Sequence, residues 1–251
     1  MSQLTIITGA SRGLGLAMAH QLLERGGQFV LCIARKPDAS LVATGGGSEL
    51  LQWAMDLSEP VAAAAHLEAW LREQPPTRFA DGATLINNAG VVSEPGPIER
   101  LDAAELSTAL RVTLEAPMLL CAAFLRATQD WAGPRKLLNI SSGLGRRAMA
   151  GAAGYCTAKA GLDSFSRVVA LDEALKPNGA KVVALAPGVI DTDMQVQLRG
   201  GDPGQFPDGK VFAQLQAKGG LATPQAAAAR VLTYLERADF GSNPVADVRD
   251  A

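Results

Sequence analysis

The sequence predicts a single α/β domain, residues 1–251, built on one doubly wound parallel sheet of about seven strands with helices on both faces. Three observations lead to this prediction. Short β-rich apolar segments alternate with amphipathic helical segments, a glycine-rich turn joins the first strand to the first helix, and no linker or repeat divides the chain. Strands that alternate with helices form parallel sheets, because each helix returns the chain to the same end of the sheet.

Composition narrows the class of protein. Hydrophobic residues make up 48% of the chain and the formal net charge is −2, so a large core can form. There is no basic block for nucleic acid and no polybasic helix for a membrane surface. The three cysteines, Cys32, Cys121 and Cys156, lack the spacing of metal ligands. We expect reduced thiols, no metal and a cytoplasmic protein without a signal or membrane segment.

Residues 3–8 are predicted to be the first strand, and residues 14–25 the first helix. The turn between them reads Thr8-Gly-Ala-Ser-Arg-Gly-Leu-Gly15. Small residues let the backbone approach a pyrophosphate, and the helix N-terminus directs its amide groups at the charge. A plain strand-to-helix turn is the alternative. The candidate cofactor residues of this turn are Gly9, Ser11, Arg12, Gly13, Leu14 and Gly15.

The end of the second predicted strand, residues 28–33, is the place where a dinucleotide-binding protein distinguishes NAD from NADP. An acidic residue at this place binds the adenosine ribose of NAD. Here Ala34 is followed by Arg35, which is suited to a 2′-phosphate, and Arg12 could hold the other side of that phosphate. We therefore predict NADPH/NADP+ as the cofactor. The alternatives are a solvated Arg35-Lys36 pair, and Asp38 as a ribose ligand.

Two further strand ends supply candidate ligands. The third strand, residues 50–55, leads into Asp56 and Leu57, where a carboxylate could accept from the adenine amino group. A helix over residues 59–73 follows. The fourth strand, residues 83–86, leads into Asn87-Asn-Ala-Gly90, and the carboxyl end of a parallel strand is where α/β proteins bind ligands. Asx turn formation is the alternative. The candidates here are Asp56, Leu57, Asn88, Ala89 and Gly90.

A long helix is predicted over residues 102–130, and Pro117 interrupts it. Proline has no N–H group to donate to the carbonyl four residues earlier, so the main-chain oxygen of Thr113 is predicted to be free.

The helix that follows the fifth strand, residues 136–140, carries Tyr155 and Lys159. These residues lie one helical turn apart and therefore share a face. A neighbouring ammonium favours the phenolate, so we expect Lys159 to lower the pKa of Tyr155 and make it a proton donor near neutral pH. Ser142 lies thirteen residues upstream of Tyr155. Arg146 and Arg147 follow it, and they either guide an anion or are simply solvated.

The rest of the chain completes the sheet. We expect a sixth strand over residues 181–185, a last helix over residues 223–237 and a short strand over residues 245–248. Residues 190–222 lack any hydrophobic period, so they are predicted to form a substrate lid loop. The apolar residues of the predicted pocket favour an uncharged, aromatic substrate. The predicted pocket residues are Leu144, Met149, Val189 and Met194, with lid residues near Phe206 and Phe212.

The motifs together resemble the short-chain dehydrogenase/reductase family. Thr8-Gly-x-x-x-Gly-x-Gly15, Asn87-Asn-Ala-Gly90, Ser142, Tyr155-x-x-x-Lys159 and Pro187-Gly188 occur in the order and roughly the spacing of that family. The match extends from Thr8 to about Met194. Glu115-Ala-Pro-Met118 and Pro187-Gly-Val-Ile-Asp-Thr-Asp-Met-Gln195 resemble the branch that contains benzil reductase and sepiapterin reductase, whose members use NADPH to reduce ketones, often vicinal dicarbonyls.

The resemblance implies a Rossmann-type fold and a role for each matching residue. Tyr155 would protonate the substrate carbonyl oxygen, Lys159 would hydrogen-bond the nicotinamide ribose, and Ser142 would orient the carbonyl. The implied partners are a small-molecule carbonyl substrate and, in a homodimer or homotetramer, further copies of the chain. The residues implied to hold the nicotinamide end are Tyr155, Lys159, Pro187, Gly188, Val189 and Thr192.

One position departs from the family pattern. The family usually has Asn in a Val-Asn-Leu context, where its main-chain carbonyl helps to hold a water that links the lysine to solvent. Here the sequence is Val112-Thr113-Leu114. Because Pro117 leaves the Thr113 carbonyl without its helical partner, we predict that Thr113 binds this water through its backbone.

Other functions fit the sequence less well. A non-catalytic NADP-binding sensor or scaffold would not need Ser142, Tyr155 and Lys159 together. An epimerase or dehydratase usually carries a larger substrate domain, and an enoyl reductase of the family spaces its Tyr and Lys more widely. A serine hydrolase would place Ser142 in a G-x-S-x-G turn, which is not the case, and would need a His base, for which neither His20 nor His66 is plausibly placed.

Overall fold

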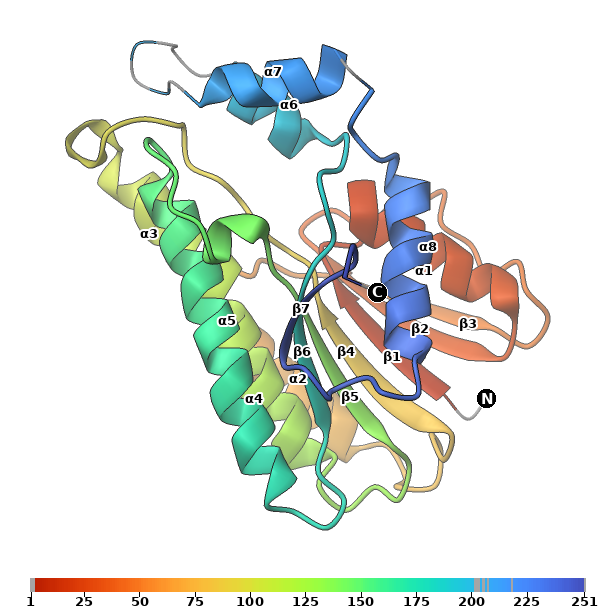
Figure 1. The fold of residues 1–251 in the computed structure, drawn as a ribbon. Coiled ribbons are helices and arrows are strands. Elements are labelled where there is room, and N and C mark those ends of the chain that lie inside the picture. Colours follow the sequence, from red (N-terminus) through yellow and green to blue (C-terminus); the bar gives the residue numbers. More distant parts are fainter. Residues whose placement is uncertain (1–2, 201–203, 205, 207, 218, 251) are drawn as a thin grey trace.

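The computed structural model describes residues 3–200, 204, 206, 208–217 and 219–250, and within the helices it leaves out the side chains of residues 198, 199, 210, 212, 213 and 216. Its sheet has the strand order β3-β2-β1-β4-β5-β6-β7, and each pair is parallel (Figure 1). The strands are β1 (Gln3–Thr8), β2 (Gln28–Ala34), β3 (Glu49–Ala54), β4 (Gly82–Asn87), β5 (Arg135–Ile140), β6 (Lys181–Ala186) and β7 (Val245–Asp247). The predicted parallel sheet is confirmed.

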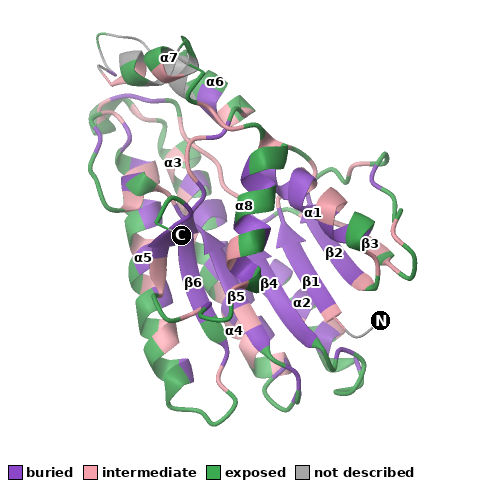
Figure 2. Ribbon diagram, turned by 45° about the vertical axis from the view of Figure 1, so that its right-hand side comes forward, coloured by how far each residue is buried: buried purple, intermediate pink, exposed green. Residues whose placement is uncertain are grey.

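Helices cover both faces of the sheet, as the alternating pattern predicts. One face packs against α1 (Gly13–Arg25) and α8 (Pro224–Glu236), and the other against α2 (Pro60–Arg72), α4 (Ala116–Ala127) and α5 (Ala153–Ala174) (Figure 1). The inner strands are buried on both faces, whereas β3 lies at an edge and is only half-buried (Figure 2). This burial explains the continuous apolar runs of β1 and β2.

The sheet contains a switch point that positions the site. The chain winds outward from β1 through β2 to β3, then returns to β4 on the other side of β1. The connections that leave the carboxyl ends of β1 and β4 therefore diverge to opposite faces. Ligands of open α/β sheets bind in the crevice that this divergence creates.

The long helix predicted over residues 102–130, with an interruption at Pro117, is confirmed between Ala103 and Ala127. The segment forms α3 (Ala103–Leu110), a π-helical turn η2 (Arg111–Glu115) and α4. Pro117 cannot donate to the Thr113 carbonyl, and the Ala116 amide just before it donates to the Arg111 carbonyl five residues back. The proline thus widens the helix locally, and the chain remains helical on either side.

The prediction that residues 190–222 form an irregular loop is wrong. Within residues 190–222 the structure contains α6 (Asp193–Arg199) and α7 (Gly209–Ala217), which lie above the carboxyl ends of the strands (Figure 1). A bridge between Ile190 and Ala222 closes the base of the segment. Each helix has only two turns or so, which is too short for a hydrophobic period to stand out. Residues 201–203, 205, 207 and 218 lie outside the described part of this segment.

The stretch Ala103–Ala127 is long and apolar enough to cross a membrane by length and composition, and half of its most apolar window is buried. Within it, Ala116, Leu120 and Phe124 are fully buried against the sheet and α2. This burial is expected of a core helix, whose apolar residues lie on the face that packs against the protein interior.

Candidate active site

A cleft of about 1300 Å³ lies at the carboxyl ends of the strands, over the switch point. Of the residues predicted to bind cofactor or substrate, all but Gly15 and the lid residues Phe206 and Phe212 line it, and so do Ser142, Tyr155 and Lys159 of the catalytic set. The predicted residues on its wall are Gly9, Ser11, Arg12, Gly13, Leu14, Arg35, Asp56, Leu57, Asn88, Ala89, Gly90, Ser142, Leu144, Met149, Tyr155, Lys159, Pro187, Gly188, Val189, Thr192 and Met194. The ends of six strands, β1 to β6, contribute these residues.

The glycine-rich turn is shaped by two close approaches. Gly9 has φ of 68°, which disfavours a side chain, and a Cβ atom there would lie 2.8 Å from the Ala89 Cα atom. A Cβ atom at Gly15 would lie 2.3 Å from the Gly9 carbonyl oxygen. Gly15 therefore does not contact the cleft as predicted. Its role is to let α1 pack directly against the turn.

The Asn87-Asn-Ala-Gly90 segment is fastened to that turn by hydrogen bonds. The Thr8 hydroxyl accepts from the main-chain amides of Asn88 and Ala89, each at 3.0 Å. The Asn88 side-chain amide donates to the carbonyls of Thr8 and Gly9, at 3.0 and 3.2 Å. Asn88 thus lines the cleft, but its amide group holds the two loops together. The sequence did not indicate this role for Thr8, because the contact spans eighty residues.

The corner of the cleft beyond β2 is cationic. Arg35 and Lys36 are exposed on its wall, and Asp56 faces Arg35 closely enough for the guanidinium to help lower the carboxyl pKa. The largest cause of that lowered pKa is a hydrogen bond from the Ser58 amide. Asp38, the alternative ribose ligand, bonds to Ser40 and is not on the cleft wall.

Arg12 already has a partner across the cleft. Its guanidinium donates to the Asp193 carboxylate at 2.8 Å, and both side chains are well exposed. The ion pair joins the glycine-rich turn to the first residue of α6, where Thr192 also packs against Gly13. An exposed pair of this kind contributes little stability, so a bound phosphate can compete for the arginine.

Tyr155, Lys159 and Ser142 come together at the inner end of the cleft. The Lys159 Nζ atom lies 5.7 Å from the centre of the Tyr155 ring and donates to the Ile140 carbonyl at 2.7 Å. The Ser142 hydroxyl, which follows β5, accepts from the Leu144 amide at 3.2 Å and hydrogen-bonds with Tyr155. The segment after β5 and the helix α5 therefore bring the Ser142 hydroxyl, the Tyr155 phenol and the Lys159 ammonium together.

The expected lowering of the Tyr155 pKa is wrong for this structure. Burial raises the pKa of Tyr155, and only the hydrogen bond with Ser142 acts in the opposite direction. Tyr155 is half-buried and lines the cleft. Burial also lowers the pKa of Lys159 to about 8, which weakens the ammonium whose influence the sequence argument invoked.

Thr113 lies in the π-helical turn, fully buried and off the cleft wall. Its hydroxyl accepts from the Val91 amide at 3.1 Å and donates to the Val91 carbonyl at 3.2 Å. The side chain thus ties the helix to the segment after β4, close to Gly90. Its carbonyl as a water ligand stays a prediction.

The predicted substrate residues form one apolar cluster beside Tyr155. Leu144, Met149 and Ala152 pack with Phe206, and Met194 of α6 packs against them. Phe206 is fully buried within this cluster. Phe212 has no described side chain.

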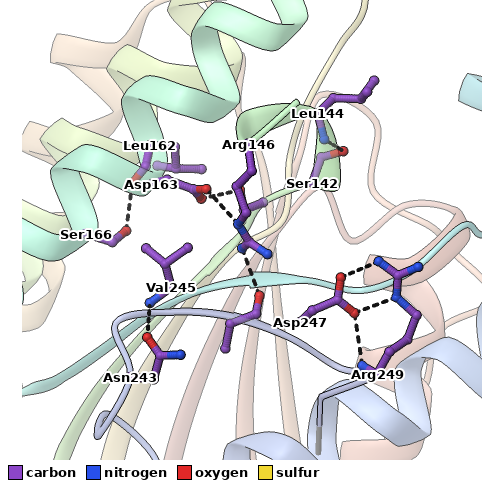
Figure 3. A network of polar contacts seen from close by, with 12 residues as sticks. Ser142, Leu144, Arg146, Leu162, Asp163, Ser166, Asn243, Val245, Asp247 and Arg249 are labelled. Atoms are coloured by element: carbon purple, nitrogen blue, oxygen red, sulfur yellow. Dashed lines mark hydrogen bonds and ion pairs between the residues drawn. The ribbon is translucent and has the colours of Figure 1, made fainter. Parts of the chain in front are cut away.

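Several functional candidates escaped the sequence reasoning. Arg147 lines the cleft, whereas Arg146 turns away from it and bonds to Asp163 and the Ala246 carbonyl (Figure 3). Asp247, the last residue of β7, and Arg249 form a bidentate pair on the cleft wall. The Arg146-Arg147 dipeptide was the only local signal. Within the described residues, no three His, Cys, Asp or Glu side chains gather as metal ligands.

Comparisons with known proteins agree with this fold. The model of the short chain dehydrogenase family matches residues 3–202. Benzil reductase ((S)-benzoin forming) of Bacillus cereus is 36% identical over 245 residues, with 96% of each chain covered. Sepiapterin reductase of Meriones unguiculatus is 31% identical over 257 residues, covering 98% of this chain and 95% of that protein.

Solved structures show the same arrangement. A metagenomic short-chain oxidoreductase in complex with NADP is 28% identical with a TM-score of 0.69, covering 94% of this chain and 92% of that one. A 3-oxoacyl-[acyl-carrier protein] reductase from Brucella melitensis in complex with NAD has a TM-score of 0.77 at 24% identity, covering 99% and 96%.

The fold and the site define an oxidoreductase with a nicotinamide cofactor. The chain belongs to the short-chain dehydrogenase/reductase family, and its relatives include the benzil reductases and sepiapterin reductase, as the motifs predicted.

Proposed function

We propose that this protein is an NADPH-dependent carbonyl reductase that reduces an apolar or aromatic ketone or a vicinal diketone. The observation that carries the proposal is the convergence of Ser142, Tyr155 and Lys159 on a cleft whose adjoining wall is the apolar cluster of Leu144, Met149 and Met194. Relatives named for benzil reduction at 36% identity support the ketone class.

Each of the four catalytic candidates has its own role in the proposed reaction. The bound nicotinamide supplies the hydride. Tyr155 donates the proton to the carbonyl oxygen, and its raised pKa keeps that proton in place at neutral pH until it is needed. Ser142 orients the carbonyl by a hydrogen bond, and Lys159 places a positive charge beside the phenol as the phenolate forms. We propose that the Thr113 carbonyl holds a water that resupplies the proton.

The cleft fits a dinucleotide with a 2′-phosphate. The Gly9 turn and the N-terminus of α1 form the pyrophosphate cradle, and Arg35 with Lys36 gives the ribose end a net positive wall opposite Asp56. Arg12, held by Asp193, is available to the same phosphate once that exposed pair opens. This cation set supports NADPH over NADH.

Arg35→Ala is expected to weaken NADPH about tenfold and to leave NADH nearly unchanged, because one charge-assisted contact to the 2′-phosphate is lost. Titration of both cofactors by fluorescence measures the two dissociation constants. Arg100→Ala, an exposed arginine off the cleft wall, is the charge-matched control. Equal weakening of NADPH and NADH would show that Arg35 does not read the phosphate.

The function is tested by following NADPH oxidation with a panel of mono- and diketones, in parallel with NADH. Turnover of aromatic diketones in preference to small aliphatic ketones is the expected result. A chain that binds NADPH tightly but oxidises it with no ketone would instead be the non-catalytic sensor or scaffold.

Further expectations concern the setting of the enzyme. We propose one domain, residues 1–251, in which residues 190–222 close over the substrate, and a cytoplasmic location. Exposed apolar side chains on the outer faces of α4 and α5 support a homodimer or homotetramer, and light scattering of the purified chain tests the assembly. These side chains are Met118, Val168, Leu171 and, just after α5, Leu175.

A further inference from the structure

Asp163 is a buried carboxylate that the proposed chemistry does not yet use. It lies on α5 one helical turn beyond Lys159 and is 1% exposed. One of its oxygens accepts a hydrogen bond from the Ser141 hydroxyl, and the other accepts from Arg146 Nε at 3.1 Å (Figure 3). Burying an ion is costly, so a carboxylate is retained at such a place only when it is well paired.

These contacts join the two halves of the catalytic group. Ser141 precedes Ser142 at the end of β5, whereas Asp163 shares a helix with Tyr155 and Lys159. The loop between them is seated directly on α5. A Cβ atom at Gly145 would lie 2.9 Å from the Lys159 carbonyl oxygen and 3.1 Å from an Asp163 oxygen. Arg146 also donates to the Ala246 carbonyl of β7 at 2.9 Å, which anchors its guanidinium.

The carboxylate also acts on Lys159 electrostatically. Burial lowers the pKa of Lys159, and the negative charge of Asp163 is the influence that raises it. The titratable groups around the ammonium are Tyr155 and Asp163 on its own helix, together with Arg146 from the loop after β5, whose guanidinium pairs with the Asp163 carboxylate.

We propose that Asp163 is a positioning residue that keeps the buried Lys159 side chain charged and holds the Ser141–Ser142 strand end against α5. The proposal rests on the carbonyl reductase function for its consequence in catalysis. The electrostatic coupling of Asp163 to Lys159 that it invokes can be measured without cofactor or substrate.

The test is the titration of Lys159 in the protein without cofactor or substrate. Lysine side chains labelled with ¹³C are followed by NMR from pH 6 to 11, and Lys159→Met assigns the resonance. Asp163→Asn keeps the shape and removes the charge. Its Lys159 midpoint is expected to fall by on the order of one pH unit, because the ammonium loses its anionic neighbour. The alkaline limb of kcat then moves to lower pH by the same amount.

Arg146→Gln provides a change of opposite sign. It removes the cation that offsets Asp163, so the Lys159 midpoint is expected to rise. Damage to packing alone would move both variants in the same direction, which would overturn the proposal. Asp172→Asn, an exposed aspartate on the same helix, is the matched control and should change neither the midpoint nor kcat.

The two levels of the proposal fail separately. If Asp163→Asn and Asp172→Asn give the same Lys159 midpoint, the coupling is absent. If the midpoint falls as expected but the wild-type chain reduces no ketone with NADPH, the coupling stands, and the reductase function and the catalytic role of Asp163 are wrong.

Discussion

Tyr155→Phe is expected to reduce kcat by at least about 10²-fold, the lower end of the contribution of a general acid, with NADPH affinity largely retained. The substitution removes one oxygen atom from a ring whose edge packs in the Leu144–Met149 cluster, so the ring should stay in place. Ser142 remains able to bind the carbonyl, but the phenol proton that the proposed reaction transfers to the carbonyl oxygen is gone. Single-turnover reduction of a diketone, monitored by NADPH absorbance, measures the chemical step directly.

The control for this variant is Tyr234→Phe. The chain has two tyrosines, and Tyr234 lies on α8 in contact with Phe240, away from the cleft wall. That variant should turn over at the wild-type rate. If Tyr155→Phe retained full turnover, Tyr155 would have no place in the mechanism and the proton would have to come from another donor.

Local signals predicted the parts of this fold that depend on neighbouring residues. β1, the turn after it and α1 are recognisable because strand propensity, glycine spacing and helical periodicity lie within twenty-five residues of one another. The strand ends that carry Arg35, Asp56 and Ser142 follow from the same rule, since the carboxyl ends of parallel strands share one edge.

What escaped the sequence depends on contacts between distant segments. The Thr8 hydroxyl accepts a hydrogen bond from the Asn88 amide eighty residues away, and Arg146 bonds to β7 a hundred residues away. The Tyr155 pKa was predicted with the wrong sign because the argument counted one neighbouring charge and omitted burial, which only the packed structure reveals. The spacing of Tyr155 and Lys159 shows that they share a helix face but not how deeply that face is buried.

Gly15→Ala tests whether the packing of α1 against the glycine-rich turn also determines the affinity for NADPH. A methyl group there would lie 2.3 Å from the Gly9 carbonyl oxygen and 2.5 Å from the Asn88 side-chain amide. The first of these atoms is backbone in a turn with φ of 68°, and the second is fastened to Thr8 and Gly9, so neither can move aside alone. Helix α1 must instead shift away from β1.

That shift should cost about 3 kcal/mol, the upper part of the range for overpacking, and should lower Tm by roughly 6–12 °C for a chain of this size. Gly46→Ala is the matched control, since a Cβ atom there has no neighbour within 4 Å. NADPH affinity should fall together with stability, because the amides at the α1 N-terminus move with the helix. An unchanged Tm with weakened NADPH would mean that Gly15 contacts the cofactor directly, as the sequence first suggested. An unchanged affinity would mean that the pyrophosphate is held elsewhere.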